Sequence, residues 1–138
     1  GPGFERGFLT VLPPIAAGSP YPTFVPRTDA DGNDLAGIRL PAIAVPLATY
    51  TGWGLRAAAF AGPDLCDAAG QHIAFASTKA ERIANGDPRL SVEERYADRD
   101  VYVNAVAQAA RDLARERLLL DEDVAAIITE AEATRFEP

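Results

Sequence analysis

The sequence predicts an α+β protein, with short proline-interrupted strands and loops in its N-terminal half and three to four helices in its C-terminal half. Two observations lead to this prediction. Residues 3–63 are rich in proline, glycine and β-branched residues, which favour extended segments and turns. Residues 77–136 instead carry apolar residues at helical spacing, preceded by residue types that cap helices.

Three segments of the N-terminal half are predicted to be extended, at residues 8–12, 21–25 and 38–47. Each is followed or interrupted by prolines, which have no N–H group to donate to a neighbouring strand. We therefore expect edge or broken strands, not the central strands of a large sheet.

The acidic run DADGND at residues 29–34 has two interpretations. Carboxylates at alternating positions can converge on one calcium ion. An EF-hand loop would need glycine at its sixth position and glutamate at its twelfth, where this chain has Asp34 and Leu40. A tight turn is therefore favoured, because Asp, Asn and Gly tolerate the hydrogen bonding and positive φ angles of turns.

Capping residues indicate where the first two helices of the C-terminal half lie. Ser77 or Thr78 is predicted to begin a short helix that ends at Asn85-Gly86. Residues 91–94 (SVEE) fit a capping box, in which the glutamate side chain returns to the backbone amide of the serine.

Two longer helices are predicted to follow. Asp100 is expected to cap the longest helix, which extends roughly to Arg117, and Asp121 is expected to cap the last one. Helical spacing places an apolar stripe on each of them. The stripes are Val103, Val106, Ala110 and Leu113 in the longest helix, and Val124, Ile127, Ile128 and Ala131 in the last.

The composition is that of an ordinary globular domain. The 138 residues are 48% hydrophobic and 24% charged, so the chain is long enough for one core and disorder is a poor explanation. Much of the apolar share is alanine and only 8% of the residues are aromatic, so we expect a thin core. No stretch approaches the roughly 20 apolar residues of a membrane-spanning helix. We expect no membrane partner.

The net charge of −7 comes from the second half of the chain, because arginines and acidic residues balance in residues 1–60. An acidic excess on predicted helices is typical of a solvated face, and an acidic docking surface is the alternative. No basic patch is present to neutralise phosphates, which argues against nucleic acid as a partner.

No serine-hydrolase triad is visible in the sequence. The nucleophile elbow G-x-S-x-G is absent, and Ser19 lies in a proline-rich stretch that does not replace it. His72 is the only histidine, and we expect it to be structural or simply exposed. We therefore assign no catalytic residue.

Metal and cofactor sites are not predicted either. One cysteine and one histidine exclude an internal disulfide and a site built from several Cys or His ligands. Cys66 lies in an apolar stretch and is expected to be a buried, inert thiol. The carboxylates of Glu93, Glu94 and Asp98 are interpreted as part of a solvated face. We predict no cofactor and no metal.

Residues 48–56 (ATYTGWGLR) form the densest candidate binding segment. Tyrosine and tryptophan offer a large contact area with a polar tip, and arginine binds carboxylates with two parallel hydrogen bonds. Tyr50, Thr51, Trp53 and Arg56 are predicted to wall a pocket or to contact another domain. An equally open alternative is that Trp53 anchors the core of a thin domain.

Several long motifs occur in one order along the chain. VPRTDADGNDLAGIRLP and AVPLATYTGW are followed by IAFASTKAER, GDPR and SVEERY. Together they resemble the late region of a bacterial family of α/β-hydrolase-domain proteins, over nearly the whole chain. One departure is Gly54, where that family tends to have asparagine. The resemblance implies ester or related hydrolysis, with the family's serine and histidine upstream of this region, so no catalytic residue is carried over.

Residues 1–2 look like a cloning scar, and residues 3–138 are expected to form a single domain that corresponds to a C-terminal module. The chain contains no methionine, which suggests that its natural start lies upstream or that the initiator methionine was replaced in cloning. The excess of arginine over lysine suggests a high-GC bacterial source.

The leading hypothesis is a non-catalytic C-terminal module of an α/β-hydrolase-like protein. It would pack against a catalytic domain, upstream or on a separate chain, or wall its pocket; self-association is another way to cover an apolar face. One alternative is a small self-sufficient enzyme of the isomerase or cyclase type, in which a carboxylate works with Tyr50 or Tyr96 in an enclosed pocket with a buried acid. The other is a binding or assembly protein with an acidic helical face.

Overall fold

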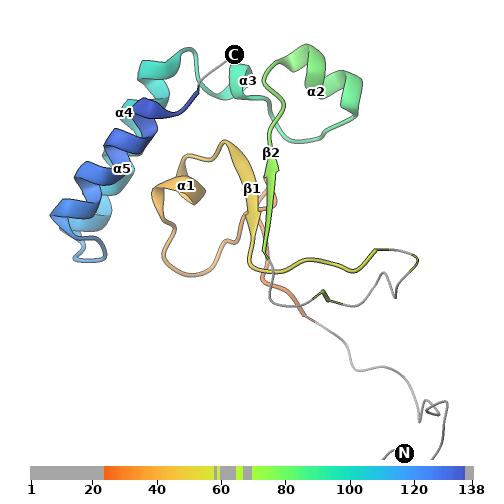
Figure 1. Ribbon diagram of the computed structural model, residues 1–138, viewed down its shortest axis with the longest axis horizontal. Helices are drawn as coiled ribbons and strands as arrows, with labels where there is room; N and C mark the ends of the chain where they lie inside the picture. The colour runs from red at the N-terminus through yellow and green to blue at the C-terminus, as the bar shows by residue number, and fades with distance from the viewer. Residues whose placement is uncertain (1–23, 58, 60–64, 67–69, 136–138) are drawn as a thin grey trace, which may run out of the picture.

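The computed structural model describes residues 24–57, 59, 65–66 and 70–135 (Figure 1). The elements in chain order are α1 (Pro41–Ala44), β1 (Ala48–Thr51), β2 (Gln71–Ala74), α2 (Lys79–Asn85), α3 (Val92–Arg95), α4 (Arg99–Arg115) and α5 (Asp121–Ala133). The α+β class and the helical C-terminal half are therefore confirmed. The extended segment predicted at residues 8–12 lies outside the described residues, as does most of the one at 21–25.

The segment at residues 38–47 was predicted to be broken extended structure, and this is wrong. It contains the short helix α1, in which Pro41 is the first residue. Proline suits that position because its fixed φ angle matches that of a helix. An N–H group at the first helical position would have no partner within the helix, so its absence costs nothing. The N–H of Val45 donates to the carbonyl of Pro41 at 2.9 Å and closes the turn.

The sheet of the described residues consists of β1 and β2, paired antiparallel. Their register places Tyr50 opposite His72 and Thr49 opposite Ile73. The backbone N–H of Phe75 donates to the carbonyl of Leu47 at 3.0 Å and extends the pairing by one step.

The run at residues 29–34 is the tight turn that the sequence favours. Oδ1 of Asp29 accepts hydrogen bonds from the N–H groups of Asp31, at 2.9 Å, and Asn33, at 3.0 Å. Gly32 has a φ of +80°, and a Cβ atom there would lie 2.8 Å from Cγ2 of Thr49. Two of the three acidic side chains of this run pair with cations, Asp29 with Arg39 and Asp31 with Arg95.

The short helix α2 begins and ends as predicted, and α3 begins as predicted. Oγ1 of Thr78 accepts from the N–H of Glu81, and Gly86 ends α2 with a φ of 65°. The capping box at the start of α3 is complete, with Ser91 and Glu94 each accepting from the other's backbone N–H.

The starts of the two long helices differ from the prediction. Asp98, not Asp100, caps α4, and its carboxylate accepts from the N–H of Val101 at 2.8 Å. Leu120 occupies the cap position of α5 without a side-chain hydrogen bond, so Asp121 is already helical. Both misplaced aspartates lie in a first helical turn, where the helix dipole favours negative charge. The sequence pattern alone does not separate that position from the cap.

The core lies where α4 and α5 pack side by side over the segment that leads into β1 (Figure 1). Its buried cluster is Tyr96, Tyr102, Val106 and Ala131, with Val45, Leu47, Val92, Val103 and Ile127 packed against it. The predicted inward stripes of α4 and α5 are thus confirmed at their centres. The core is thin, because half of the buried apolar side chains are alanines. Within the described part of the chain, no helix is long and apolar enough to cross a membrane.

Candidate functional site

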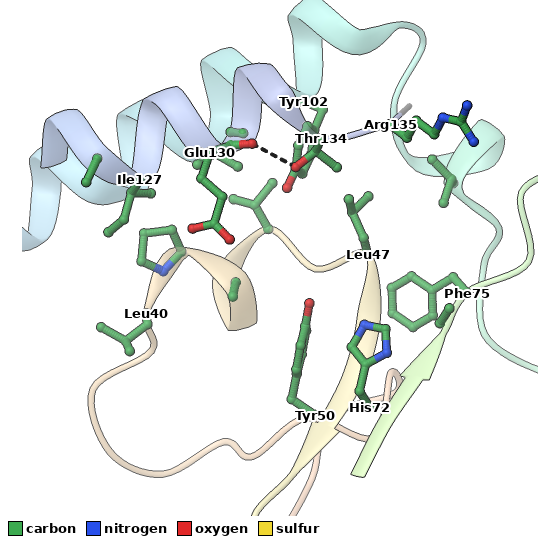
Figure 2. Close-up of a pocket in the computed structure, with 18 of the residues that line it drawn as sticks. Leu40, Leu47, Tyr50, His72, Phe75, Tyr102, Ile127, Glu130, Thr134 and Arg135 are labelled. Carbon is green, nitrogen blue, oxygen red and sulfur yellow. Dashed lines mark hydrogen bonds between the residues drawn. The ribbon is translucent and has the colours of Figure 1, made fainter. Parts of the chain in front are cut away.

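An open hollow of about 700 Å³ is lined by residues of the β1–β2 pair and of helices α1, α4 and α5 (Figure 2). Its walls are mainly apolar. The larger apolar side chains that line it include Leu40, Leu47, Phe75, Val92, Val106 and Ile127. Polar and aromatic side chains stand among them and give the hollow its chemical character, including Tyr50, His72, Tyr102, Asp123, Glu130 and Arg135.

Tyr50 and His72 enter the hollow from the two paired strands. They are directly opposite in the register, so their side chains share one face of the sheet. Their rings meet edge to face, with centroids 5.1 Å apart and an interplanar angle of 64°. Tyr50 is half-buried, whereas His72 is exposed.

Tyr102 enters from α4 and is buried, with its ring edge to face against that of Tyr96 at a centroid distance of 5.3 Å. Burial raises the pKa of Tyr102, and the charges of Tyr50 and Glu130 raise it further. Burial, with Glu130 adding to it, also raises the pKa of Tyr50. Both phenols are therefore neutral hydroxyl groups at neutral pH. The same carboxylate contributes to the raised pKa of each.

That carboxylate belongs to Glu130 on α5. The side chain is exposed and, among the described residues, no arginine, lysine or histidine forms an ion pair with it. Figure 2 shows the carboxylate of Glu130 and the hydroxyl of Tyr50 both directed into the hollow, from opposite walls. The hollow is thus an apolar cleft with two tyrosine hydroxyls and the carboxylates of Glu130 and Asp123, neither of which forms an ion pair among the described residues.

The sequence of this chain was compared with models of known protein families. A family model described as "alpha/beta hydrolase domain" matches residues 10–129. The chain belongs to the alpha/beta hydrolase domain family. The resemblance found in the sequence motifs is therefore confirmed. Neither a curated protein nor a solved structure matches the chain.

Hydrolysis by a catalytic serine requires the serine as nucleophile, a base beside it and an acid that orients the base. Among the described residues no hydrogen bond links a serine to His72, whose ring contacts Tyr50 instead. Ser91 is fully buried, and its hydroxyl donates to Glu94 at 2.9 Å within the capping box. Ser91 therefore has a structural role.

The expectation of a buried Cys66 is wrong, because this thiol is exposed. Cys66 follows an isolated bridge between Leu55 and Leu65, in the long connection between β1 and β2. Connections of this kind run over protein surfaces, so an apolar local sequence does not by itself bury a side chain.

Of the four predicted site residues, only Tyr50 lines the hollow. Thr51, Trp53 and Arg56 follow it in the chain and do not line the hollow. The hydroxyl of Thr51 donates to the carbonyl of Trp53, and Nε of Arg56 donates to the carbonyl of Leu65 at 3.2 Å. Trp53 is half-buried and lies outside the core cluster. Its indole Nε1 is buried without a hydrogen-bond partner in the described part of the chain.

Tyr102, His72 and Glu130 line the hollow, and the sequence analysis predicted none of them to be a site residue. The helical spacing of Tyr102, Val106 and Ala110 is a signal that could have found Tyr102. His72 was expected to be structural or exposed, and it is exposed. Its place in the hollow depends on the pairing with Tyr50, which no local pattern predicts.

Two arginines, Arg89 and Arg95, contact Phe75 next to the β1–β2 sheet. Arg89 donates to Oγ1 of Thr49 at 2.7 Å and to the carbonyl of Ile73 at 3.0 Å, so it joins both strands. The guanidinium groups of Arg89 and Arg95 lie over the ring of Phe75, at 5.0 and 4.2 Å from its centroid. These contacts hold the strand that carries Tyr50 in position.

Acid is expected to destabilise this arrangement. Hydrogen bonds from the Arg89 side chain lower the pKa of Asp87 from 3.8 to about 2, and hydrogen bonds from Arg82 lower that of Glu94 from 4.5 to about 2. A carboxylate with a depressed pKa stabilises the folded state above its unfolded pKa and loses that contribution as the pH falls through the folded value. The midpoint of urea unfolding should therefore be lower at pH 3 than at pH 6.

Glu94→Gln is the matched control for this pH dependence. It removes one of the two depressed carboxylates, so the difference in midpoint between pH 6 and pH 3 should shrink. Equal midpoints at the two pH values for the unmodified chain would contradict the prediction.

Proposed function

We propose that this chain is a non-catalytic C-terminal module of an alpha/beta hydrolase, and that its hollow faces the catalytic domain and forms one wall of the substrate pocket. The single observation that supports this most is the open apolar hollow itself. Leu40, on its rim, is 49% exposed. Monomeric proteins rarely leave a continuous apolar surface of this kind without a partner or a ligand.

The chemistry of the described residues agrees with a supporting role. The only histidine is exposed and contacts a tyrosine, and Ser91 is committed to a helix cap. A wall of this kind acts by shape and by excluding water from the pocket. The nucleophile and its base would come from the catalytic domain.

The alternative of a small self-sufficient enzyme requires an enclosed pocket with a buried acid. The two acidic side chains that line the hollow, Asp123 and Glu130, are both exposed, and the hollow is open. Neither is the buried acid that this alternative requires. The module is therefore the better-supported function.

The test is assembly with the catalytic domain that this proposal requires, upstream in the same gene or on a separate chain. The two pieces are expressed separately, mixed and analysed by size-exclusion chromatography, with hydrolysis of p-nitrophenyl butyrate measured on each sample. We expect the pieces to co-elute and the mixture to hydrolyse the ester faster than the catalytic piece alone. The isolated chain should show no activity above background.

A pair of matched variants locates the interface. Leu40→Glu places a charge on the rim of the hollow, whereas Ile83→Glu places the same charge on α2, where the side chain is 62% exposed and does not line the hollow. Burying an unpaired charge is costly, so Leu40→Glu should weaken co-elution about tenfold or more. Ile83→Glu should leave it unchanged.

Two results would overturn the proposal. One is ester hydrolysis by the isolated chain that survives His72→Ala. The other is assembly that tolerates Leu40→Glu as well as it tolerates Ile83→Glu.

A further inference from the structure

We propose that the hollow selects a ligand with a positively charged organic group, an alkylammonium of the kind found on amines and quaternary ammonium compounds, attached to an apolar body. This inference rests on the proposed function, because it treats the hollow as part of a substrate pocket. It goes further by naming the chemical class of what the pocket accepts. Charge, tyrosine hydroxyl groups and apolar area all favour the same ligand.

The charge in the hollow is negative where a ligand would meet it. Glu130 projects into the cleft and has no ion-pair partner among the described residues, and Asp123 adds a second exposed carboxylate on the same helix. The basic side chain on the rim, Arg135, already has an interaction of its own. An incoming cation is therefore attracted, and an incoming carboxylate or phosphate meets two like charges.

The aromatic side chains add a second contribution. Tyr50 from β1 and Tyr102 from α4 both line the hollow, and both lie close enough to Glu130 for its charge to act on their hydroxyl groups. The hydroxyl oxygen of Tyr50 and the carboxylate of Glu130 are both directed into the hollow, and both attract a positive charge. A quaternary ammonium group, which donates no hydrogen bond, suits such a site.

The apolar wall determines the rest of the ligand. Leu40, Leu47 and Ile127 line the cleft beside the charged group. An alkyl chain that lies along these side chains is removed from water, which favours binding in proportion to the apolar area buried. A cleft of about 700 Å³ accommodates a group of this size, since small-molecule pockets run from roughly 300 to 1,000 Å³.

The experiment compares two probes with the same apolar chain and opposite charge. The full 138-residue chain is titrated with hexyltrimethylammonium and, separately, with hexyl sulfate, while NMR shifts of the backbone amides and tyrosine rings are followed. We expect hexyltrimethylammonium to bind with a Kd of about 1 mM and to shift signals of Tyr50 and Glu130. Hexyl sulfate should bind at least about tenfold more weakly.

Matched variants separate the site from the general acidity of the chain. Glu130→Gln removes the carboxylate in the hollow, and Glu132→Gln makes the same change two residues away on α5, at an exposed side chain that does not line the hollow. Glu130→Gln should weaken hexyltrimethylammonium binding about fivefold, and Glu132→Gln should leave it unchanged. Both positions are exposed, so neither variant should affect folding.

Three outcomes would overturn the inference: absence of saturable binding, equal or tighter binding of hexyl sulfate, and equal weakening by the two glutamine variants. These outcomes are independent of the proposed function, because they are measured on the chain alone. If the chain co-elutes with the hydrolase domain through the Leu40 rim but shows no preference for the cation, only the ligand class is wrong. If it binds the cation but does not assemble, the module proposal is wrong.

Discussion

Asn33→Ala is expected to destabilise the folded chain by about 3 kcal/mol, the largest effect that we anticipate from a single substitution. The Asn33 side chain is completely buried. Its Nδ2 group donates to the carbonyl of Ala48 at 3.1 Å, and its Oδ1 atom accepts from the N–H of Tyr50 at 2.7 Å. The amide therefore satisfies two backbone groups of β1 in the way that a neighbouring strand would.

Alanine at this position leaves both backbone groups without a partner. Each buried polar group that loses its hydrogen bond costs about 1–3 kcal/mol, which is more than the bond contributes when it is present. A cavity of the size of the lost amide adds to this cost. The measurement is the free energy of unfolding from urea titration followed by circular dichroism.

Asn104→Ala is the matched control. Asn104 is exposed on α4, where alanine is the better helix former, so this variant should change the stability by no more than about 0.5 kcal/mol. A loss in Asn33→Ala no larger than that in the control would mean that the turn at residues 29–34 is not attached to β1 in solution. The position of Tyr50 in the hollow should also change, because the Asn33 amide accepts a hydrogen bond from the backbone N–H of Tyr50.

Local features of this fold could be predicted from the sequence, because the groups that make them are a few residues apart. The cap at Thr78, the left-handed Gly86 and the Ser91–Glu94 box each involve hydrogen bonds within one helical turn. The turn that begins at Asp29 is of the same kind. In these places, the residue types and their spacing are enough to predict the hydrogen bonds.

Long-range features could not be predicted in the same way. The pairing of β1 with β2 joins residues that are 20 to 26 positions apart, from Thr51 with Gln71 to Ala48 with Ala74, and no turn motif marks the connection. Pro41 shows a related difficulty, because the proline that ends a strand also suits the first position of a helix. The choice between these roles depends on the segment packing beneath α4, which is tertiary information.

The candidate site shows the same division. Tyr50 was chosen for the chemistry of its side chain, and Tyr102 follows a helical spacing that the sequence displays. Glu130 is an ordinary exposed glutamate by every local criterion. It matters only because α5 packs against α4 and brings its carboxylate over the strand that carries Tyr50.

Arg95→Ala is expected to destabilise the chain by about 2 kcal/mol, because one guanidinium connects parts of the fold that are distant in sequence. Arg95 forms an ion pair with both carboxylate oxygens of Asp31, 64 positions away, and donates to the carbonyl of Leu90 at 3.0 Å. It also lies over the ring of Phe75. Removing it leaves the Asp31 carboxylate, only 19% exposed, without its cation.

The exposed pair of Arg115 and Asp112 provides the comparison for this prediction. The Arg115 side chain is 74% exposed, against 13% for Arg95, and surface ion pairs contribute only about 0–1 kcal/mol because water and salt screen them. Urea titration should therefore rank Arg95→Ala well below Arg115→Ala in stability. Adding Asp31→Asn to Arg95→Ala should recover part of the loss, because the unpaired charge is then gone. If the double variant is less stable than Arg95→Ala alone, Asp31 serves the fold through its other contacts and not through this ion pair.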